Sequence, residues 1–85
     1  MAENSKIIMF GANWCHDCVR TTKQLNELGV PFEYINIEEV EGAADEAKAI
    51  SGRINIPVMV YPDGTHQVEP SNKEVEAKLT ELSII

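Results

Sequence analysis

The pattern of apolar and polar positions predicts a strand, a helix and a second strand in the first half of the chain. Residues 6–10 form a short apolar run that ends at Gly11, as expected of a strand buried on both faces. Residues 32–37 are rich in β-branched and aromatic types, which favour a second strand. Between the two runs, one face of a helix is predicted from Cys18, Thr22, Leu25 and Leu28, and Gly29 and Pro31 end it. A strand, a helix and a strand in this order form a βαβ unit, whose two strands are parallel.

The second half predicts a helix, a hairpin and a last helix. Residues 38–50 are acidic and alanine-rich, with the acidic run as the start of a helix that ends at Gly52; its apolar face contains Ala43, Ala47 and Ile50. Residues 57–61 and 66–68 form two strands joined by a tight Pro-Asp-Gly turn. A capping box and an apolar stripe define the last helix; these residues are Ser71 and Glu74, then Val75, Leu79 and Leu82.

Composition narrows the class of protein. With 85 residues, 44% of them apolar and 25% charged, the chain is expected to form one domain over residues 1–85. Fourteen acidic and seven basic residues give a net charge of −7, which argues against binding to nucleic acid or to an anionic membrane surface. The apolar runs are far shorter than the roughly 20 residues of a membrane span. Because no basic segment leads into an apolar one at the start, we expect no secretory leader and a cytoplasmic location.

Two cysteines, Cys15 and Cys18, form a C-x-x-C motif within the sequence Trp-Cys-His-Asp-Cys. A disulfide that closes so short a loop adds little stability, and secreted miniproteins of this size usually carry more cysteines, so chemistry is the better explanation. A thiol attacks disulfides as its thiolate, which a helix N-terminus favours. Since Cys15 is expected where the first strand runs into the helix, we predict Cys15 as the nucleophile and Cys18 as the resolving thiol.

Several alternatives stay open for the residues of this motif and around it. A zinc site needs four ligands, and the chain offers two thiols with His16 and His66; an inert pair of reduced thiols is a further alternative. A protonated His16 would stabilise the thiolate, whereas Asp17 would oppose it or only favour the first helical turn. Trp14 either presents an exposed aromatic face to a partner or packs in the core. The bond before Pro57 is either cis or trans.

Taken in order, these motifs resemble those of the thioredoxin-fold redoxins, and within them the glutaredoxin-like group. The similarity is closest to the mycoredoxins, which use mycothiol in place of glutathione. Three features carry it: the tryptophan before the motif, the sequence Asn-Ile-Glu at residues 36–38, and the ending P-S-x-x-E-V-x-A-K-L at residues 70–79. The resemblance implies an α/β, thioredoxin-like fold with a four-stranded mixed sheet flanked by helices.

The resemblance also implies roles for individual residues. Pro57 would be a cis-proline facing the active site, and the backbone of Ile56 would bind a thiol or peptide. Cys15 would form the mixed disulfide with the small thiol. Arg20 would bind an anionic substrate or be a plain surface residue. The expected substrate-binding residues are Trp14, His16, Asp17, Arg20, Ile56, Pro57, Pro70, Ser71 and Asn72.

The chain departs from the glutaredoxin pattern at two places that concern glutathione. Many glutaredoxins have a basic residue three positions before the nucleophile, where this chain has Ala12. Their glycine pair before the last helix is missing around residues 69–70. Both departures weaken the expectation of glutathione as the thiol.

We therefore expect a monomeric thiol–disulfide oxidoreductase that reduces protein or small-thiol mixed disulfides. Its co-substrate would be mycothiol or glutathione, with no tightly bound cofactor and no metal. Its partners would be that thiol, disulfide-bearing proteins and, as an option, a thioredoxin-type reductase. Three alternatives are kept: an NrdH-redoxin-like electron donor reduced by thioredoxin reductase, an iron–sulfur or metal carrier, and a redox-inert interaction module.

Overall fold

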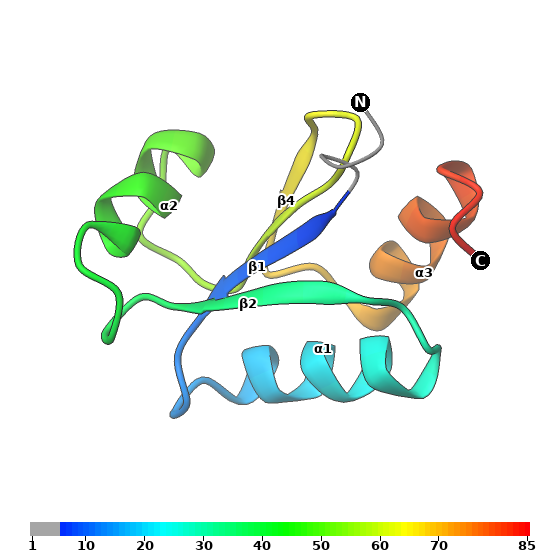
Figure 1. Ribbon diagram of the computed structural model, residues 1–85, viewed down its shortest axis with the longest axis horizontal. Coiled ribbons are helices and arrows are strands. Elements are labelled where there is room, and N and C mark those ends of the chain that lie inside the picture. The colour runs from blue at the N-terminus through cyan, green and yellow to red at the C-terminus, as the bar shows by residue number, and fades with distance from the viewer. Residues whose placement is uncertain (1–5) are drawn as a thin grey trace.

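The computed structural model describes residues 6–85, so the beginning of the chain, where no secretory leader is expected, lies outside the described residues. The elements follow the predicted order: β1 (Ile7–Gly11), α1 (His16–Glu27), β2 (Phe32–Asn36), α2 (Ala43–Ser51), β3 (Val58–Val60), β4 (His66–Val68) and α3 (Asn72–Glu81). The four strands form one mixed sheet in the order β2-β1-β3-β4, with the helices packed around it (Figure 1). The predicted thioredoxin-like α/β fold is confirmed.

Strand β1 lies inside the sheet and fixes the register of both of its neighbours. It runs parallel to β2, from the pair Ile7 and Phe32 to the pair Gly11 and Asn36, and antiparallel to β3. Strand β3 pairs antiparallel with β4 across the hairpin turn. Because β1 and β2 are parallel, the loop that leaves β1 toward α1 begins beside the end of β2.

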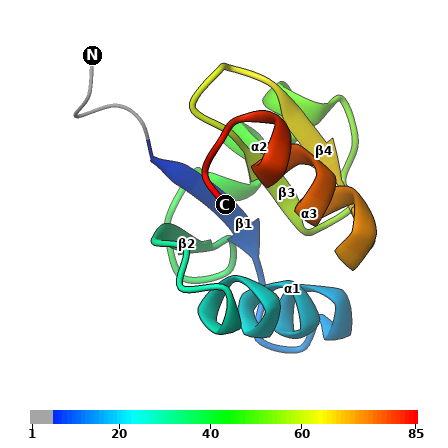
Figure 2. The same cartoon turned by 90° about the vertical axis from the view of Figure 1, so that its right-hand side faces the viewer.

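Alternate residues of β1 face two separate cores, because successive side chains of a strand point to opposite faces. One core lies between the sheet and helices α1 and α3, and is formed by Ile7, Met9, Leu25, Val30, Met59, Tyr61, Val75 and Leu79. The other lies under α2, and is formed by Phe10, Ala43, Ala47 and Val58. Figure 2 shows this layering, with α3 in front of the sheet and α2 behind it. Burial on both faces explains why the sequence of β1 is apolar throughout.

The buried face of α1 is shifted from the predicted one. Its buried residues are Cys18, Thr21 and Leu25, whereas Thr22 is half-buried and Leu28 is 40% exposed. The prediction was therefore wrong at Thr22 and Leu28. A hydroxyl at Thr21 tolerates burial because its Oγ1 donates a hydrogen bond to the carbonyl of Asp17 at 2.9 Å. Leu28 is the C-cap residue, where the helix has already left the core.

The acidic stretch after β2 forms turns rather than the start of a helix, so that part of the prediction was wrong. Asn36 Oδ1 accepts the N–H of Glu38 at 2.9 Å, and the Asn36 carbonyl accepts the N–H groups of Glu39 and Val40. Helix α2 begins only after Gly42, whose φ of 82° is left-handed. Asn36 thus stabilises the turn locally, which delays the helix.

The capping box and the hairpin turn are confirmed, whereas Leu82 is the half-buried C-cap residue of α3 and not part of its buried face. The capping box of α3 is complete, since Ser71 Oγ accepts the N–H of Glu74 and the Glu74 carboxylate accepts the N–H of Ser71. The Pro-Asp-Gly turn joins β3 to β4, with Gly64 at a φ of 88°. None of the helices formed by residues 6–85 has the length and apolar character needed to cross a membrane.

There is no room for a side chain at Gly11, so a substitution at this position tests the packing between β1 and α1. A Cβ at this position would lie 2.9 Å from Cys18 Sγ and 3.1 Å from the ring of Tyr34. We expect Gly11→Ala to lower the free energy of unfolding by about 1–3 kcal/mol, as overpacking of a core does, measured by urea denaturation. Adding Cys18→Ala should recover part of this loss. A strictly additive double-mutant cycle would show that the two residues are not in contact.

Asp63 makes the stability of the hairpin depend on pH. Its carboxylate accepts hydrogen bonds from the hydroxyl and N–H of Thr65 at 2.6 and 3.0 Å, and from Lys78 at 3.1 Å. These bonds, those from Thr65 foremost, lower the pKa of Asp63 from 3.8 to about 2. A lowered pKa stabilises the fold above the unfolded pKa, and this contribution is lost as the pH falls through the folded pKa.

Wild-type protein should therefore lose more stability than Asp63→Asn when the pH is lowered from about 5 to about 2. The measurement is the urea midpoint of both proteins across this range. The asparagine variant should be the less stable of the two at the upper end, and the gap should close toward the lower end. A constant gap would show that Asp63 gains nothing from its partners in the folded state.

Candidate active site

Cys15 occupies the N-cap of α1, directly after the loop that leaves β1. Its Sγ accepts a hydrogen bond from the backbone N–H of Cys18 at 3.1 Å, and its own N–H donates to the carbonyl of Ala12 at 3.1 Å. Sulfur at this position faces the positive end of the helix dipole and an otherwise unpaired N–H, both of which interact better with a thiolate than with a thiol. Its side chain remains 7% exposed and reaches a cavity at the surface.

The environment of Cys18, unlike that of Cys15, favours the protonated thiol over the thiolate. It lies one turn further into α1, is 1% exposed, and packs against Gly11. Burial, followed by the hydrogen bond with Cys15, raises the pKa of the Cys18 thiol to about 12, and the negative charge of Asp17 adds to this shift. Both cysteines are free thiols in this structure. The pair thus consists of a largely buried sulfur that borders a cavity and a thiol that is buried completely behind it.

The segment before β3 forms the wall opposite Cys15. The Ile56–Pro57 peptide bond is cis, as the resemblance implies, and Pro57 is fully buried. The carbonyl of Ile56 lies 3.9 Å from Cys15 Sγ and accepts the weak hydrogen bond of the thiol. Pro57 itself is behind this wall, where its carbonyl accepts the N–H of Glu69 at 2.9 Å. The Ile56 carbonyl therefore lies directly beside Cys15 Sγ.

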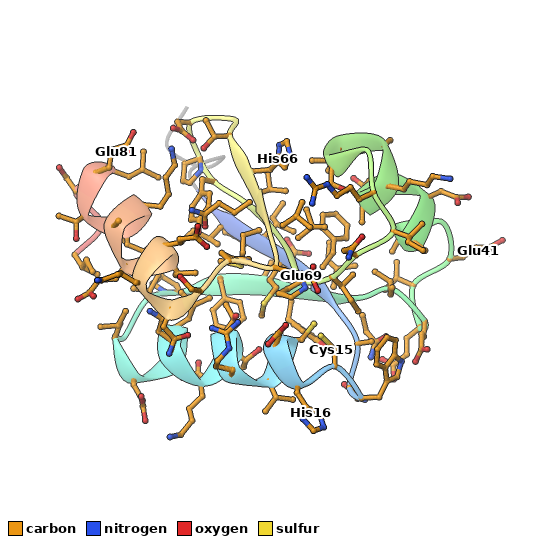
Figure 3. All side chains as sticks on the ribbon, turned by 180° about the vertical axis from the view of Figure 1, so that it is seen from behind. Cys15, His16, Glu41, His66, Glu69 and Glu81 are labelled. Carbon is orange, nitrogen blue, oxygen red and sulfur yellow. The ribbon has the colours of Figure 1, made fainter. Side chains whose placement is uncertain are left out.

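A surface cavity of about 460 Å³ opens beside the nucleophile. It is lined by Trp14, Cys15, His16, Asp17, Ile54, Asn55, Ile56 and Glu69. Two carboxylates, on Asp17 and Glu69, face it, and neither lysine nor arginine is among its lining residues in the described part of the chain. We call it the Cys15 cavity. Figure 3 shows Glu69 close to Cys15, with His16 pointing outward from the start of α1.

Trp14 is exposed at the surface and does not pack in the core, which was the alternative left open by the sequence. Its side chain is 63% exposed, and the indole N–H donates a hydrogen bond to Glu38 at 2.8 Å. Asn36 supports the same loop through a bond from its amide to Asn13 at 3.3 Å. The exposed tryptophan is therefore held at the edge of the cavity by Glu38, which follows β2.

Arg20 is not among the residues that line the Cys15 cavity, but it contacts one of them, Asp17. Its guanidinium donates hydrogen bonds to the side chain of Asn72 and, at 3.0 Å, to the carbonyl of Pro70, and it lies 3.4 Å from the carboxylate of Asp17. Gln24 adds a bond to the Asn72 carbonyl at 2.7 Å. These contacts tie α1 to the segment before α3. The other face of Arg20 borders a shallow hollow on the far side of Trp14.

The structure brings only part of the predicted binding set to the cavity. Trp14, His16, Asp17 and Ile56 line it. Three other predicted residues do not line the Cys15 cavity. Pro70 is buried, Ser71 caps α3, and the side chain of Asn72 accepts a hydrogen bond from Arg20.

Sequence reasoning missed three lining residues, Ile54, Asn55 and Glu69. For Ile54 and Asn55, the only indication in the sequence was that they lie close to Pro57, which was expected to face the active site. For Glu69 the only signal was the departure from the glutaredoxin glycine pair around residues 69–70, and it reaches the cavity through the closure of the hairpin.

The zinc hypothesis finds no support from the geometry. Within residues 6–85, no group of three or more His, Cys, Asp or Glu side chains is placed to hold a metal ion. His66 is exposed on β4, well away from Cys15 in Figure 3.

Comparisons with known proteins agree with this geometry. A family model described as glutaredoxin matches residues 7–67. The chain is 30% identical over 80 residues to mycoredoxin 1 of Corynebacterium glutamicum, covering 93% of this chain and 99% of that protein. Among solved structures, the methanoredoxin of Methanosarcina acetivorans superposes with a TM-score of 0.79 at 27% identity, covering 89% of this chain and 85% of that one. A glutaredoxin of Archaeoglobus fulgidus gives a TM-score of 0.76 at 29% identity, with coverages of 86% and 84%.

The different environments of the two sulfurs predict selective alkylation. Near neutral pH, iodoacetamide should modify Cys15 and leave Cys18 unmodified, with a difference in rate of at least about tenfold, measured by peptide mass mapping. Cys18 should also stay unmodified in a Cys15→Ser variant, because burial, the largest cause of its raised pKa, persists there. Rapid alkylation of Cys18 in that variant would contradict its assignment as the protonated partner.

Proposed function

Because this chain belongs to the glutaredoxin family and is a thiol–disulfide oxidoreductase of that family, we propose that it reduces mixed disulfides between proteins and mycothiol. The observation that carries the choice of thiol is the charge of the Cys15 cavity, which holds two carboxylates and no lysine or arginine among the described residues. The similarity to a protein named mycoredoxin 1 supports the same choice.

The reaction follows from the two sulfur environments. The Cys15 thiolate attacks the sulfur of the bound small thiol, the substrate disulfide breaks, and the substrate protein leaves as a thiolate. The small thiol is then held on Cys15 as a mixed disulfide, with the Ile56 backbone beside it. Cys18 loses its proton, attacks Cys15 Sγ and releases the small thiol, which leaves a Cys15–Cys18 disulfide. Two electrons have passed from the dithiol to the substrate, and a second small thiol or a reductase restores them.

Charge distinguishes the candidate thiols. Glutathione carries two carboxylates, and one or both would approach Asp17 and Glu69 in the Cys15 cavity. Mycothiol joins an acetylated cysteine to a sugar unit and carries no carboxylate, so it brings hydroxyl and amide groups instead. The Asn55 amide can donate hydrogen bonds to such groups and accept them, and the two carboxylates can accept hydrogen bonds from the hydroxyl and amide N–H groups. The site therefore favours the uncharged thiol.

The proposed setting is the cytoplasm, where a pool of reduced small thiol would regenerate the dithiol. Arg20 does not line the Cys15 cavity and is already hydrogen-bonded to Pro70 and Asn72. We assign it a positioning role, in that it holds the segment carrying Glu69 against α1.

The test is mass spectrometry of a Cys18→Ser variant exposed in separate tubes to mycothiol disulfide and to glutathione disulfide. The variant cannot resolve, so the adduct stays on Cys15. We expect the mycothiol adduct to form about tenfold faster, since only glutathione meets like charges in the cavity. A Cys15→Ser control should form neither adduct. Equal or faster reaction with glutathione would overturn mycothiol as the co-substrate, and no reaction with either would favour an electron donor fed by a reductase.

A further inference from the structure

Glu69 is held in the Cys15 cavity by contacts from both of its neighbours in space. Its N–H donates to the carbonyl of Pro57 at 2.9 Å, and its Oε1 accepts a hydrogen bond from the amide of Asn55 at 3.1 Å. The residue has a φ of 50°, a left-handed conformation that is uncommon for a glutamate. The carboxylate is thus fixed to the same segment that contains Ile56, across the cavity from Cys15. In Figure 3 it lies near Cys15, whereas Glu41 and Glu81 lie at opposite ends of the molecule.

No lysine or arginine lines the cavity beside this carboxylate in the described part of the chain. Asp17 contributes a second carboxylate, which is paired with the Arg20 guanidinium at 3.4 Å, whereas Glu69 forms no ion pair among the described residues. The whole chain carries a net charge of −7, so distant charges do not reverse the sign. A disulfide that approaches Cys15 therefore enters a region of negative potential whose inner wall carries Glu69.

From this geometry we propose that Glu69 is a specificity-determining residue that selects protein disulfides flanked by lysine or arginine. The inference rests on the proposed function and narrows its substrate class. A cation beside the substrate disulfide would pair with the Glu69 carboxylate while the disulfide sulfur meets Cys15 Sγ. Such substrates also suit the chemistry, because cysteines beside basic residues have lowered pKa values, form mixed disulfides readily and are good leaving groups.

The reaction that would show this selection is a single exchange. The Cys15 thiolate attacks one sulfur of a symmetric peptide disulfide, the S–S bond breaks, one peptide is held on Cys15 and the other leaves as a thiolate. In a Cys18→Ser background the exchange stops there, so the rate of adduct formation reports the approach of the disulfide to Cys15. No external oxidant or reductant is needed.

The experiment compares Glu69→Gln with its parent, both carrying Cys18→Ser, on three capped tripeptide disulfides with lysine, serine or glutamate on both sides of the cysteine. Glutamine keeps an oxygen that can accept the Asn55 amide, so the substitution removes mainly the charge. Dividing each rate by that of the serine peptide cancels changes in the nucleophilicity of Cys15. We expect the lysine-to-glutamate rate ratio to fall by about threefold to tenfold in Glu69→Gln, and less at high salt.

The matched control is Glu41→Gln, which removes one exposed carboxylate outside the Cys15 cavity and should leave the ratio unchanged. An unchanged ratio in Glu69→Gln, or an equal fall in Glu41→Gln, would overturn the proposed role of Glu69 while leaving the oxidoreductase activity intact. Failure of the parent to react with any of the three peptides would also overturn this selection of protein disulfides, whereas the proposed function would be contradicted by failure of the same parent to form the mycothiol adduct. Circular dichroism of each variant identifies a loss of fold.

Discussion

The contact between Cys18 and Gly11 is the constraint on which the active site depends. Because Gly11 has no side chain, the Cys18 sulfur packs directly on the end of β1, and the first turn of α1 is fixed to the centre of the sheet. Two consequences follow from this one contact. Cys18 is buried, which raises its pKa to about 12 and keeps it a thiol. Cys15, one turn earlier, is left at the N-cap, where the N–H of Cys18 points at its sulfur.

The second wall of the cavity is built differently, from loops that hold one another. The carbonyl of Pro57 accepts the N–H of Glu69, the Asn55 amide binds the Glu69 carboxylate, and Arg20 fixes the next residue of the chain through the Pro70 carbonyl. Since Arg20 belongs to α1, the helix that presents Cys15 also fixes the loop facing it. This wall is therefore held partly through backbone carbonyls, those of Pro57 and Pro70, and partly by a bond between two of its own lining side chains, Asn55 and Glu69.

Features with a local physical signal could be predicted from the sequence. The C-x-x-C motif after an apolar strand located both cysteines, and Ser71 with Glu74 marked the start of α3 through reciprocal hydrogen bonds three residues apart. The predictions failed where the periodicity of apolar residues does not mark the true end or start of a helix. Leu28 matched the helical period but lies at the end of α1, and Glu38 suited a helix N-terminus, yet Asn36 holds it in a turn. Neither effect is visible in the spacing of apolar residues.

Glu69 shows the same limit at the site itself. It is 54 positions from Cys15 in the sequence, as the numbering gives, and no short-range pattern links the two. Its place in the cavity results from the pairing of β3 with β4, which brings the residue after β4 back to the residue before β3. Both thiols and Asp17 thus lie in one continuous segment, residues 11–18, whereas Glu69 reaches the cavity from a separate loop. Because the backbone N–H of Glu69 is bonded to Pro57 whatever its side chain, the proposed selection of substrates by Glu69 can change on this fold without moving the cysteines.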